Sequence, residues 1–188
     1  MIEKRRQLFL AVLKDRDDET RALAAEALNA LDAARSLEHL LKILRTGDRG
    51  QRMRAIFALE KFESAQVFKP LLSELESNDA DIRGAAAQVL GNKCHPKTIG
   101  SLVKLLKDPQ PSVRVYAAAA LGNFRDPRLL PYLTPLLSSD DDRLVLATAA
   151  ALGKIGSPDA QDALAPLISD PRPEIRRAAV KALAALRC

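Results

Sequence analysis

The sequence predicts an all-α protein folded as an α-α superhelix, a solenoid of about twelve helices with a 31-residue repeat. Leucine recurs at this interval without an insertion, at Leu28, Leu59, Leu90, Leu121, Leu152 and Leu183. A second column in the same phase is apolar throughout, at Leu13, Leu44, Leu75, Leu106, Leu137 and Ile168. Two columns in constant register indicate stacked copies of one helical unit, each burying an apolar face of its neighbour.

The best-formed unit, residues 108–138, predicts a helical hairpin. Its first helix, over residues 111–124, places alanine and leucine at helical spacing along one face. Gly122 ends or kinks that helix, because glycine accepts the left-handed turn that other residues resist. The second helix begins at Asp126 and Pro127, an N-cap acceptor followed by proline at the first helical position.

The register divides the chain into repeats of one domain, residues 1–188. Residues 1–14 align with second helices and give an N-terminal half repeat that caps the array. Residues 15–169 give five full repeats, and residues 170–188 give a C-terminal half repeat that is a first helix alone.

Composition restricts the classes of function. The chain is 47% hydrophobic, which suffices for a core, but 4% aromatic and without tryptophan, which argues against an aromatic-lined ligand pocket. Its formal charge of +5 permits an acidic partner. No apolar run approaches about 20 residues, so we expect a cytoplasmic protein outside the membrane. Cys94, Cys188, His39 and His95 have no metal-ligand spacing, so no metal or cofactor is expected.

The motif of each unit resembles a HEAT repeat. It reads Asp-Pro, an arginine four or five residues later, Ala-Ala-x-Ala-Leu-Gly, and then Pro-x-x-Leu-x-x-Leu-Leu. The segments DPQPSVRVYAAAALGNF (residues 108–124) and DPRPEIRRAAVKALAAL (residues 170–186) match best. The pattern is similar to the short HEAT-like repeats of the PBS-lyase type over essentially the whole chain. The resemblance implies that second helices line a concave side, where partners usually bind.

An arginine at the start of the first helices is the most regular polar feature, and it occurs at Arg21, Arg52, Arg83, Arg114 and Arg176. In three units an aspartate stands four residues before it, which gives the pairs Asp17–Arg21, Asp48–Arg52 and Asp79–Arg83. That spacing puts both side chains on one helix face, and the forked guanidinium also reaches an adjoining turn. We interpret this column as a structural ladder between repeats rather than a ligand site.

Outward positions of the second helices hold many lysines, so the binding face that the resemblance implies is expected to be basic. The expected partner-binding residues on this face are His39, Lys42, Lys69, Lys97, Lys104, Arg128 and Tyr132. They favour a protein partner with an acidic surface, and the alternative that these lysines only keep the face soluble stays open. The last full repeat supplies Asp159 and Asp162 instead, so the face should become less basic there.

The third unit departs from the pattern. Lys93 stands in an otherwise apolar column, and Cys94 and His95 follow it. Adjacent side chains in a turn rarely aim at one point, and a second pair of metal ligands is missing. We interpret this segment as a loosened turn rather than a metal or nucleophile site.

The sequence shows no nucleophile triad, phosphate loop or paired-carboxylate site, so we predict no catalysis and favour a protein–protein interaction scaffold. A basic-groove binder of nucleic-acid backbone is one alternative, although an aromatic site of the kind that HEAT-like DNA glycosylases use is lacking. The repeat type suggests another, a phycobilin-lyase-like subunit that helps attach a chromophore. The C-terminal helix carries apolar residues such as Val180 that lack a following helix. Docking of a partner, self-association with a second copy and simple tolerance of the exposed surface are the three alternatives there, and self-association is the hypothesis for this end.

Overall fold

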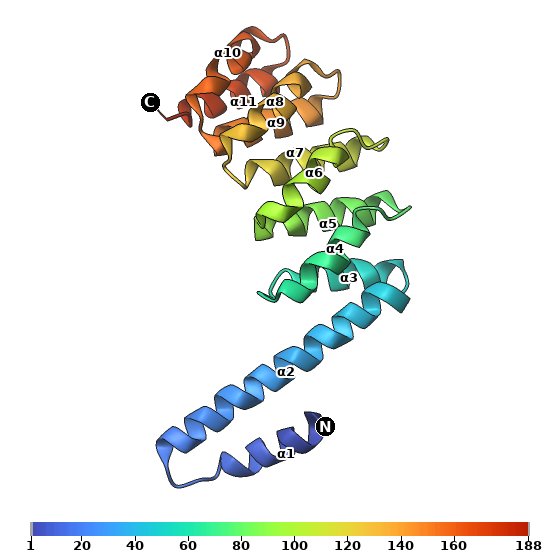
Figure 1. Ribbon diagram of the computed structural model, residues 1–188. Coiled ribbons are helices and arrows are strands. Elements are labelled where there is room, and N and C mark those ends of the chain that lie inside the picture. The colour runs from blue at the N-terminus through green and yellow to red at the C-terminus, as the bar shows by residue number, and fades with distance from the viewer. Residues whose placement is uncertain (1, 188) are drawn as a thin grey trace.

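The computed structural model describes residues 2–187, and over this range the protein is a stack of helices without strands (Figure 1). The chain climbs the stack layer by layer, so its two ends lie at opposite ends of the molecule (Figure 1). This arrangement confirms the predicted α-α superhelix. Within the described range, no helix combines the length and apolar character needed to cross a membrane.

The repeats alternate between first and second helices. The first helices are α3 (Arg49–Leu59), α5 (Ala80–Lys93), α7 (Pro111–Gly122), α9 (Asp142–Ile155) and α11 (Pro173–Ala184). The second helices are α4 (Phe68–Glu74), α6 (Ile99–Leu105), α8 (Leu130–Leu133) and α10 (Gln161–Leu164). Short 3-10 turns precede them, at Ala65–Val67, Pro96–Thr98, Pro127–Leu129 and Pro158–Ala160.

The last two second helices are short because proline interrupts them. After α8 and α10 the chain continues as 3-10 segments, Thr134–Ser138 and Ala165–Ser169. Pro135 and Pro166 stand at the start of these segments, where a proline removes the backbone N–H that an α-helix would use.

First helices from α5 onward pack backbone to backbone. A Cβ added at Gly91 would lie 2.4 Å from the Cβ of Ala120. One added at Gly122 would lie 2.6 Å from the Cα of Ala151. Only glycine permits an approach this close, so the glycine of each repeat sets the spacing of the layers.

The two sides of the stack are packed differently. Consecutive first helices from α5 to α11 are in extensive contact, whereas consecutive second helices touch one another little. The stack is therefore packed most closely along the first helices, whereas the resemblance implied a concave side lined by the second helices. Small residues on the first helices allow this approach, because side-chain size sets the distance between helices.

Helix α2 (Asp18–Thr46) is the largest difference from the predicted hairpins. It is one helix of 29 residues where two helices and a turn were expected, so the described range has eleven α-helices rather than twelve (Figure 1). The later second helices have capping residues at Ser64, His95, Asp126 and Ser157. The same register position holds Ala33, followed by Ala34, and Asn29 replaces the glycine. Without a stop or a start signal, the helix continues.

The N-terminal hairpin stands apart from the main core. Helix α1 (Ile2–Val12) packs against the first half of α2, and Ala24 is buried there outside the main hydrophobic cluster. The main cluster begins at Leu37 in the second half of α2. Asn29 stands in the glycine column, and its side chain is too large for the close contact that the later layers make.

Candidate functional site

Three connected hollows lie along the first-helix face, and together we call them the trough. The first has a volume of about 210 Å³ and is lined by Met53, Phe57, Asp81, Ala85, Gln88 and Tyr116. The second, about 260 Å³, shares Gln88 and Tyr116 with the first. The third, about 320 Å³, shares Lys154 with the second. The shared side chains make the trough continuous from α3 to α11.

Two exposed aromatic side chains shape the first hollow. Phe57 is 40% exposed and Tyr116 is 41% exposed. The Tyr116 ring lies over Gly84 on the preceding helix, where an added Cβ would come within 2.8 Å of the ring carbon Cδ2. Rigid aromatic groups beside a hollow supply large contact area at low entropic cost, which is typical of binding sites.

The wall of the second hollow is a polar ladder across four layers. The Lys154 Nζ donates to the Asn123 Oδ1 at 2.8 Å, and the Asn123 Nδ2 donates to the Asn92 Oδ1 at 3.2 Å. The Asn92 Nδ2 in turn donates to the Glu60 Oε1 at 3.0 Å. These bonds join α3 through α9 and give the trough a hydrogen-bonding edge beside its apolar floor.

The third hollow has a floor of small residues and a basic rim. Its floor is formed by Ala150, Gly153, Ala178, Ala182 and Ala185. Lys154 and Lys181 stand at the rim, and both side chains are exposed. Toward the C-terminal end the trough therefore offers positive charge over a flat apolar surface.

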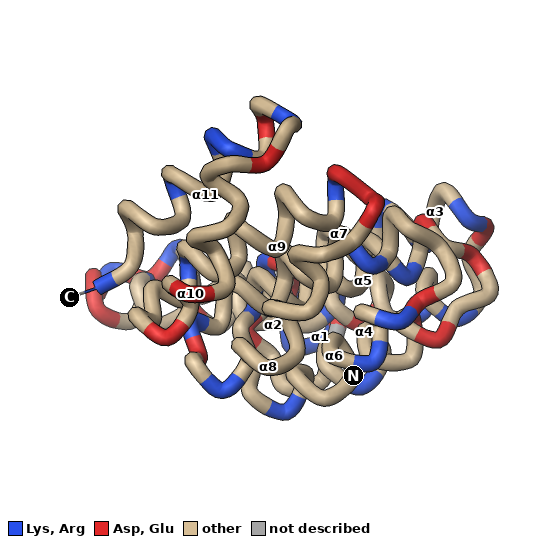
Figure 2. Tube along the Cα trace, turned by 90° about the horizontal axis from the view of Figure 1, so that it is seen from above, with Lys and Arg blue, Asp and Glu red and all other residues tan. Residues whose placement is uncertain are grey.

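The predicted partner-binding residues lie on the opposite side. All seven are exposed on or beside the second helices, and none lines a hollow of the trough: His39, Lys42, Lys69, Lys97, Lys104, Arg128 and Tyr132. In Figure 2 blue lysine and arginine segments gather along the edge of the array around α6 and α8.

Arg128 is held by its own neighbour. Its Nε donates to the Asp126 Oδ1 at 2.9 Å and its Nη2 donates to the Asp126 Oδ2 at 2.7 Å. This fork and the Arg128 backbone N–H hold the pKa of Asp126 below its ordinary value. The guanidinium charge is thus largely balanced before any partner arrives.

Phe57 and Tyr116 were missed because they stand on first helices, which were expected on the convex side. One signal in the sequence could have found them. Gly84 occupies a register position that holds Met53, Val115 and Leu146 in neighbouring repeats, and a glycine inside a helix indicates a close approach by another group. Here that group is the tyrosine ring of the next layer.

The arginine column ties turns together, but not through the predicted spacing of four residues. The carboxylates of Asp17, Asp48 and Asp79 instead cap backbone N–H groups at the starts of their helices. Four of the five arginines donate from Nη1 to a carbonyl oxygen six residues earlier, at 2.7 to 2.9 Å, in the pairs Arg21–Asp15, Arg83–Ser77, Arg114–Asp108 and Arg176–Asp170.

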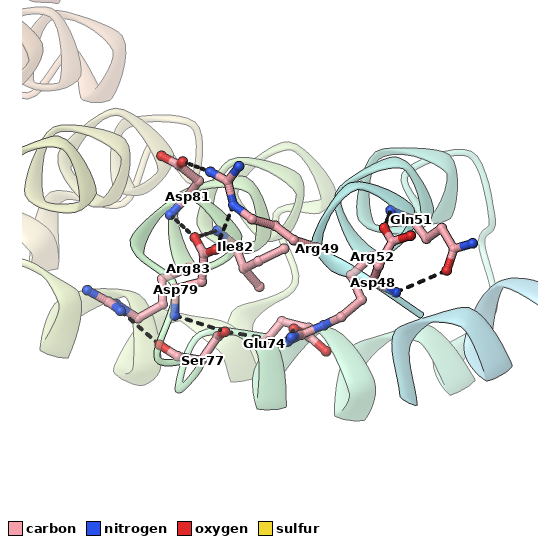
Figure 3. Close-up of polar contacts among 10 residues, drawn as sticks. All are labelled: Asp48, Arg49, Gln51, Arg52, Glu74, Ser77, Asp79, Asp81, Ile82 and Arg83. Carbon is pink, nitrogen blue, oxygen red and sulfur yellow. Dashed lines mark hydrogen bonds and ion pairs between the residues drawn. The ribbon is translucent and has the colours of Figure 1, made fainter. Parts of the chain in front are cut away.

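Arg83 also reaches the next layer. Its Nε and Nη2 donate to the two carboxylate oxygens of Asp108 at 2.7 and 2.8 Å, and both side chains are nearly buried. Burial alone would raise the pKa of Asp108, but Arg83 and the N–H of Gln110 hold it below its ordinary value. Arg52 contacts Glu74 and Ser77 in the equivalent place one layer earlier (Figure 3).

A second ion pair between layers occurs with both polarities. Figure 3 shows Arg49 at the start of α3 reaching Asp79 and Asp81 at the start of α5, with Nε 2.7 Å from the Asp79 Oδ2. Three repeats later the charges are reversed, and the Arg172 Nη1 donates to the Asp142 Oδ1 at 2.5 Å. The position requires complementary charge, while either layer can supply the cation.

The irregular third unit is well tied, which corrects the expectation of a loosened turn. The Lys93 Nζ donates to the carbonyl oxygens of Glu60 at 2.9 Å and Phe62 at 2.7 Å, so it caps the end of α3, which lacks a glycine. His95 caps the next turn by accepting from the Lys97 N–H, and its ring contacts Phe68 at a centroid distance of 4.3 Å.

Cys94 and His95 do not form a reactive pair. The Cys94 thiol donates to the carbonyl oxygen of Gly91 at 3.0 Å, and burial raises the pKa of this thiol. Across residues 2–187 no three His, Cys, Asp or Glu side chains are grouped so that they could hold a metal ion.

Stacked hairpins joined by such ladders define an α-solenoid repeat protein. A family model described as HEAT repeats matches residues 68–152 and 146–187. The chain therefore belongs to the HEAT-repeat family, as the motifs predicted. A search of curated proteins finds no match.

Solved structures with a similar fold include natural and designed repeat proteins. The complex of CpcE and CpcF of phycocyanin lyase from Nostoc sp. PCC7120 matches with 26% identity and a TM-score of 0.71. That match covers 80% of this chain but 64% of the other, so this chain spans less than two thirds of its length. A designed armadillo repeat protein in complex with the peptide (KR)4 matches with 19% identity and a TM-score of 0.63, over 96% of this chain and 98% of that one. At this identity, the second match shows the fold alone.

Proposed function

We propose that this protein is a non-catalytic scaffold that binds a partner protein in the trough. The observation that carries the proposal is the first hollow, where Phe57 and Tyr116 stay exposed in a molecule with few aromatic residues. A rigid, preformed surface loses little conformational entropy on binding. Most of the free energy gained by burying the two aromatic rings is therefore available as binding affinity.

The dimensions of the trough suit an extended segment or a helix of the partner. The first and third hollows are separated by about three layers of about 9 Å each, roughly 27 Å. This equals about 18 residues of α-helix or about eight residues of strand. The alanine floor permits close approach, and the ladder of Asn92 and Asn123 offers hydrogen bonds along one edge.

The charge of the trough favours an acidic partner segment. Lys154 and Lys181 flank the third hollow, whereas the acid in the first hollow, Asp81, is already bound to Arg49. We propose that an apolar side chain of the partner enters the first hollow and that carboxylates face the two lysines. The partner would meet the scaffold in the cytoplasm, where a free thiol such as that of Cys94 stays reduced, and cell fractionation tests this location.

Affinity capture with two matched variants tests the proposal. Tyr116→Arg places a charge in the first hollow, and Tyr132→Arg places the same charge on the second-helix face, where Tyr132 is 52% exposed. We expect Tyr116→Arg to lose the proteins captured by the wild type and Tyr132→Arg to keep them. The opposite pattern would place binding on the second-helix face, and capture of nucleic acid by that face would favour the backbone-binding alternative.

A second candidate is a subunit of a chromophore-attaching pair, which the 26% identity with the phycocyanin lyase complex favours. In that case the trough would hold another subunit or a linear tetrapyrrole. Absorption spectra of a linear tetrapyrrole mixed with this protein test the idea. A saturable shift of the spectrum that is lost in Tyr116→Arg would support the second candidate. An unchanged spectrum would contradict it and leave the scaffold function as the proposal.

A further inference from the structure

The outer surface of the last layer exposes residues that every inner layer buries. We call this surface, formed by Ile168, Arg176, Arg177, Val180 and Lys181, the C-terminal edge. Val180 is 57% exposed, while the residues at its register position in four other repeats, Ile56, Ala87, Ala118 and Ala149, are fully buried. Ile168 is 48% exposed, while its counterparts in the four preceding repeats are at most 6% exposed, at Leu44, Leu75, Leu106 and Leu137. In each inner layer, the next helical hairpin covers this surface.

The C-terminal edge also carries one half of an ion pair between layers. Arg83 donates to the backbone carbonyl of Ser77 in its own turn. It also donates to the carboxylate of Asp108 in the turn of the next layer. Arg176 occupies the same register position three repeats later. It donates to the carbonyl oxygens of Asp170 and Pro171, and no carboxylate within residues 2–187 pairs with it.

The N-terminal hairpin carries the other half. Asp15 lies three repeats before Asp108, and its turn is built in the same way. Its Oδ1 accepts the Asp17 N–H at 2.9 Å, as the Asp108 Oδ1 accepts the Gln110 N–H at 2.9 Å. Asp15 is exposed, and no arginine of an earlier layer binds its carboxylate in the described part of the chain.

The two surfaces are complementary in charge and shape. The edge carries three cationic side chains, Arg176, Arg177 and Lys181, and Figure 2 shows blue lysine and arginine segments along α11. The turn before α2 and the first residues of α2 carry the acids Asp15, Asp17, Asp18 and Glu19. Leu23, 61% exposed, has the register position of Tyr116, which covers the preceding layer. At the position where Gly91 meets Ala120, the edge has Ala184 and the hairpin has Ala27, so two copies meet there at a wider spacing than two inner layers do.

We propose that the C-terminal edge of one copy binds the α1–α2 hairpin of a second copy, head to tail, with Arg176 paired to Asp15 of the second copy. The surfaces lie at opposite ends of the molecule, so the contact is heterologous and can repeat from copy to copy (Figure 1). Two C-terminal edges do not bind each other, because their cations repel. This refines the predicted self-association at the C-terminal end.

The association is weaker than the contact between two inner layers. Arg5 in α1 holds the register position of the buried residues Val67, Thr98, Leu129 and Ala160. A polar residue there lowers the apolar area that the contact buries, as in the capping repeats of other arrays. The assembly is therefore reversible and depends on protein concentration and on salt.

Sedimentation velocity of the full chain over a range of concentrations tests the proposal. We expect a shift from monomer to a series of oligomers as concentration rises, and a return toward monomer at high salt. Arg176→Glu or Asp15→Arg alone should weaken association roughly tenfold. The double variant, which exchanges the charges, should restore it.

A second pair of variants controls for effects on folding. Val180→Glu should abolish association, and Tyr132→Glu, an equally exposed site on the second-helix face, should leave it unchanged. A monomer at every concentration would overturn the proposal. So would association that none of the edge variants changes, or dimers that Arg176→Glu strengthens, since these indicate a two-fold contact between edges.

Discussion

Arg83 illustrates how a single side chain couples two layers of the stack. Three of its nitrogen atoms bind a carbonyl of its own turn and both carboxylate oxygens of Asp108 in the next turn. Because both side chains are nearly buried, water cannot easily replace either one as the hydrogen-bond partner of the other. The arginine thus stabilises the turn and the spacing of the layers together.

Removing this arginine should cost substantial stability. Arg83→Ala leaves the Asp108 carboxylate without its main partner, so we expect the free energy of unfolding to fall by about 2–3 kcal/mol. Arg128→Ala is the control, because that side chain is 88% exposed and pairs only locally, and its free energy of unfolding should match that of the wild type. Chemical denaturation measures both, and equal losses in the two variants would contradict the assigned role.

Acid stability reports on the capped turns. The side chain and N–H of Arg172 lower the pKa of Asp170 from its ordinary 3.8 to about 2. Above the ordinary value the carboxylate is charged in both states and its contribution is complete. As the pH falls from about 4 toward 2, the unfolded chain takes up a proton first, and that contribution is lost. Asp170→Asn should therefore show a shallower fall of unfolding free energy over this window, and a slope equal to wild type would contradict the assignment.

At the scale of helices, the sequence predicted most of the helices that the structure contains. The 31-residue register placed the starts of the hairpins from α3 onward, but the glycine column that was expected to end the first helices lies inside α5 and α9, where it serves close packing instead. The register wrongly predicted a turn inside α2, although the residues at three register positions explain why no turn forms there. A stop signal is a local property of one residue, and Asn29, Ala33 and Ala34 lack it, so a repeat can be in register and still not turn.

The length of α2 is directly measurable. Spin labels on cysteines at Glu19 and Arg45, with the native cysteines replaced, should lie roughly 39 Å apart along one helix, plus the linkers. Ala34→Pro should shorten and broaden this distance, because proline inside a helix breaks it. A short distance in the wild type would mean that residues 18–46 form a hairpin like the other repeats.

The glycine of each repeat should be essential only where layers meet. Gly122→Ala forces a Cβ to within 2.6 Å of the Ala151 backbone, so we expect a loss of about 1–3 kcal/mol. Gly100 lies in α6 with no heavy atom within 4 Å of the added Cβ. Gly100→Ala should leave stability equal or raise it by up to about 1 kcal/mol. Thermal unfolding compares the two, and similar melting temperatures would argue against backbone packing at Gly122.

At the scale of the whole molecule, the sequence predicted the solenoid but not which face is hollowed. Curvature arises from the difference in spacing between the two sides of the stack, and a single repeat does not contain that difference. The lysines on the second helices favoured that side as the binding face, whereas Phe57 and Tyr116 occupy helix positions that no motif of the repeat marks. The contacts between layers distinguish the two faces.

The trough and the two ends of the stack would act together in an assembly of several copies. The trough provides a partner site that runs across the layers, and head-to-tail contact would continue that trough into the next copy. A longer partner would then bind several hollows in series, which increases affinity without new kinds of contact.

Lysine labelling of the free protein and of its captured complex tests the central claim about the binding face. Reactivity at each lysine is read by mass spectrometry after brief acetylation. We predict that the partner protects Lys154 and Lys181 in the trough, while Lys69, Lys97 and Lys104 on the second-helix face react as they do in the free protein. Protection of the second set with free reactivity at Lys154 and Lys181 would contradict the account.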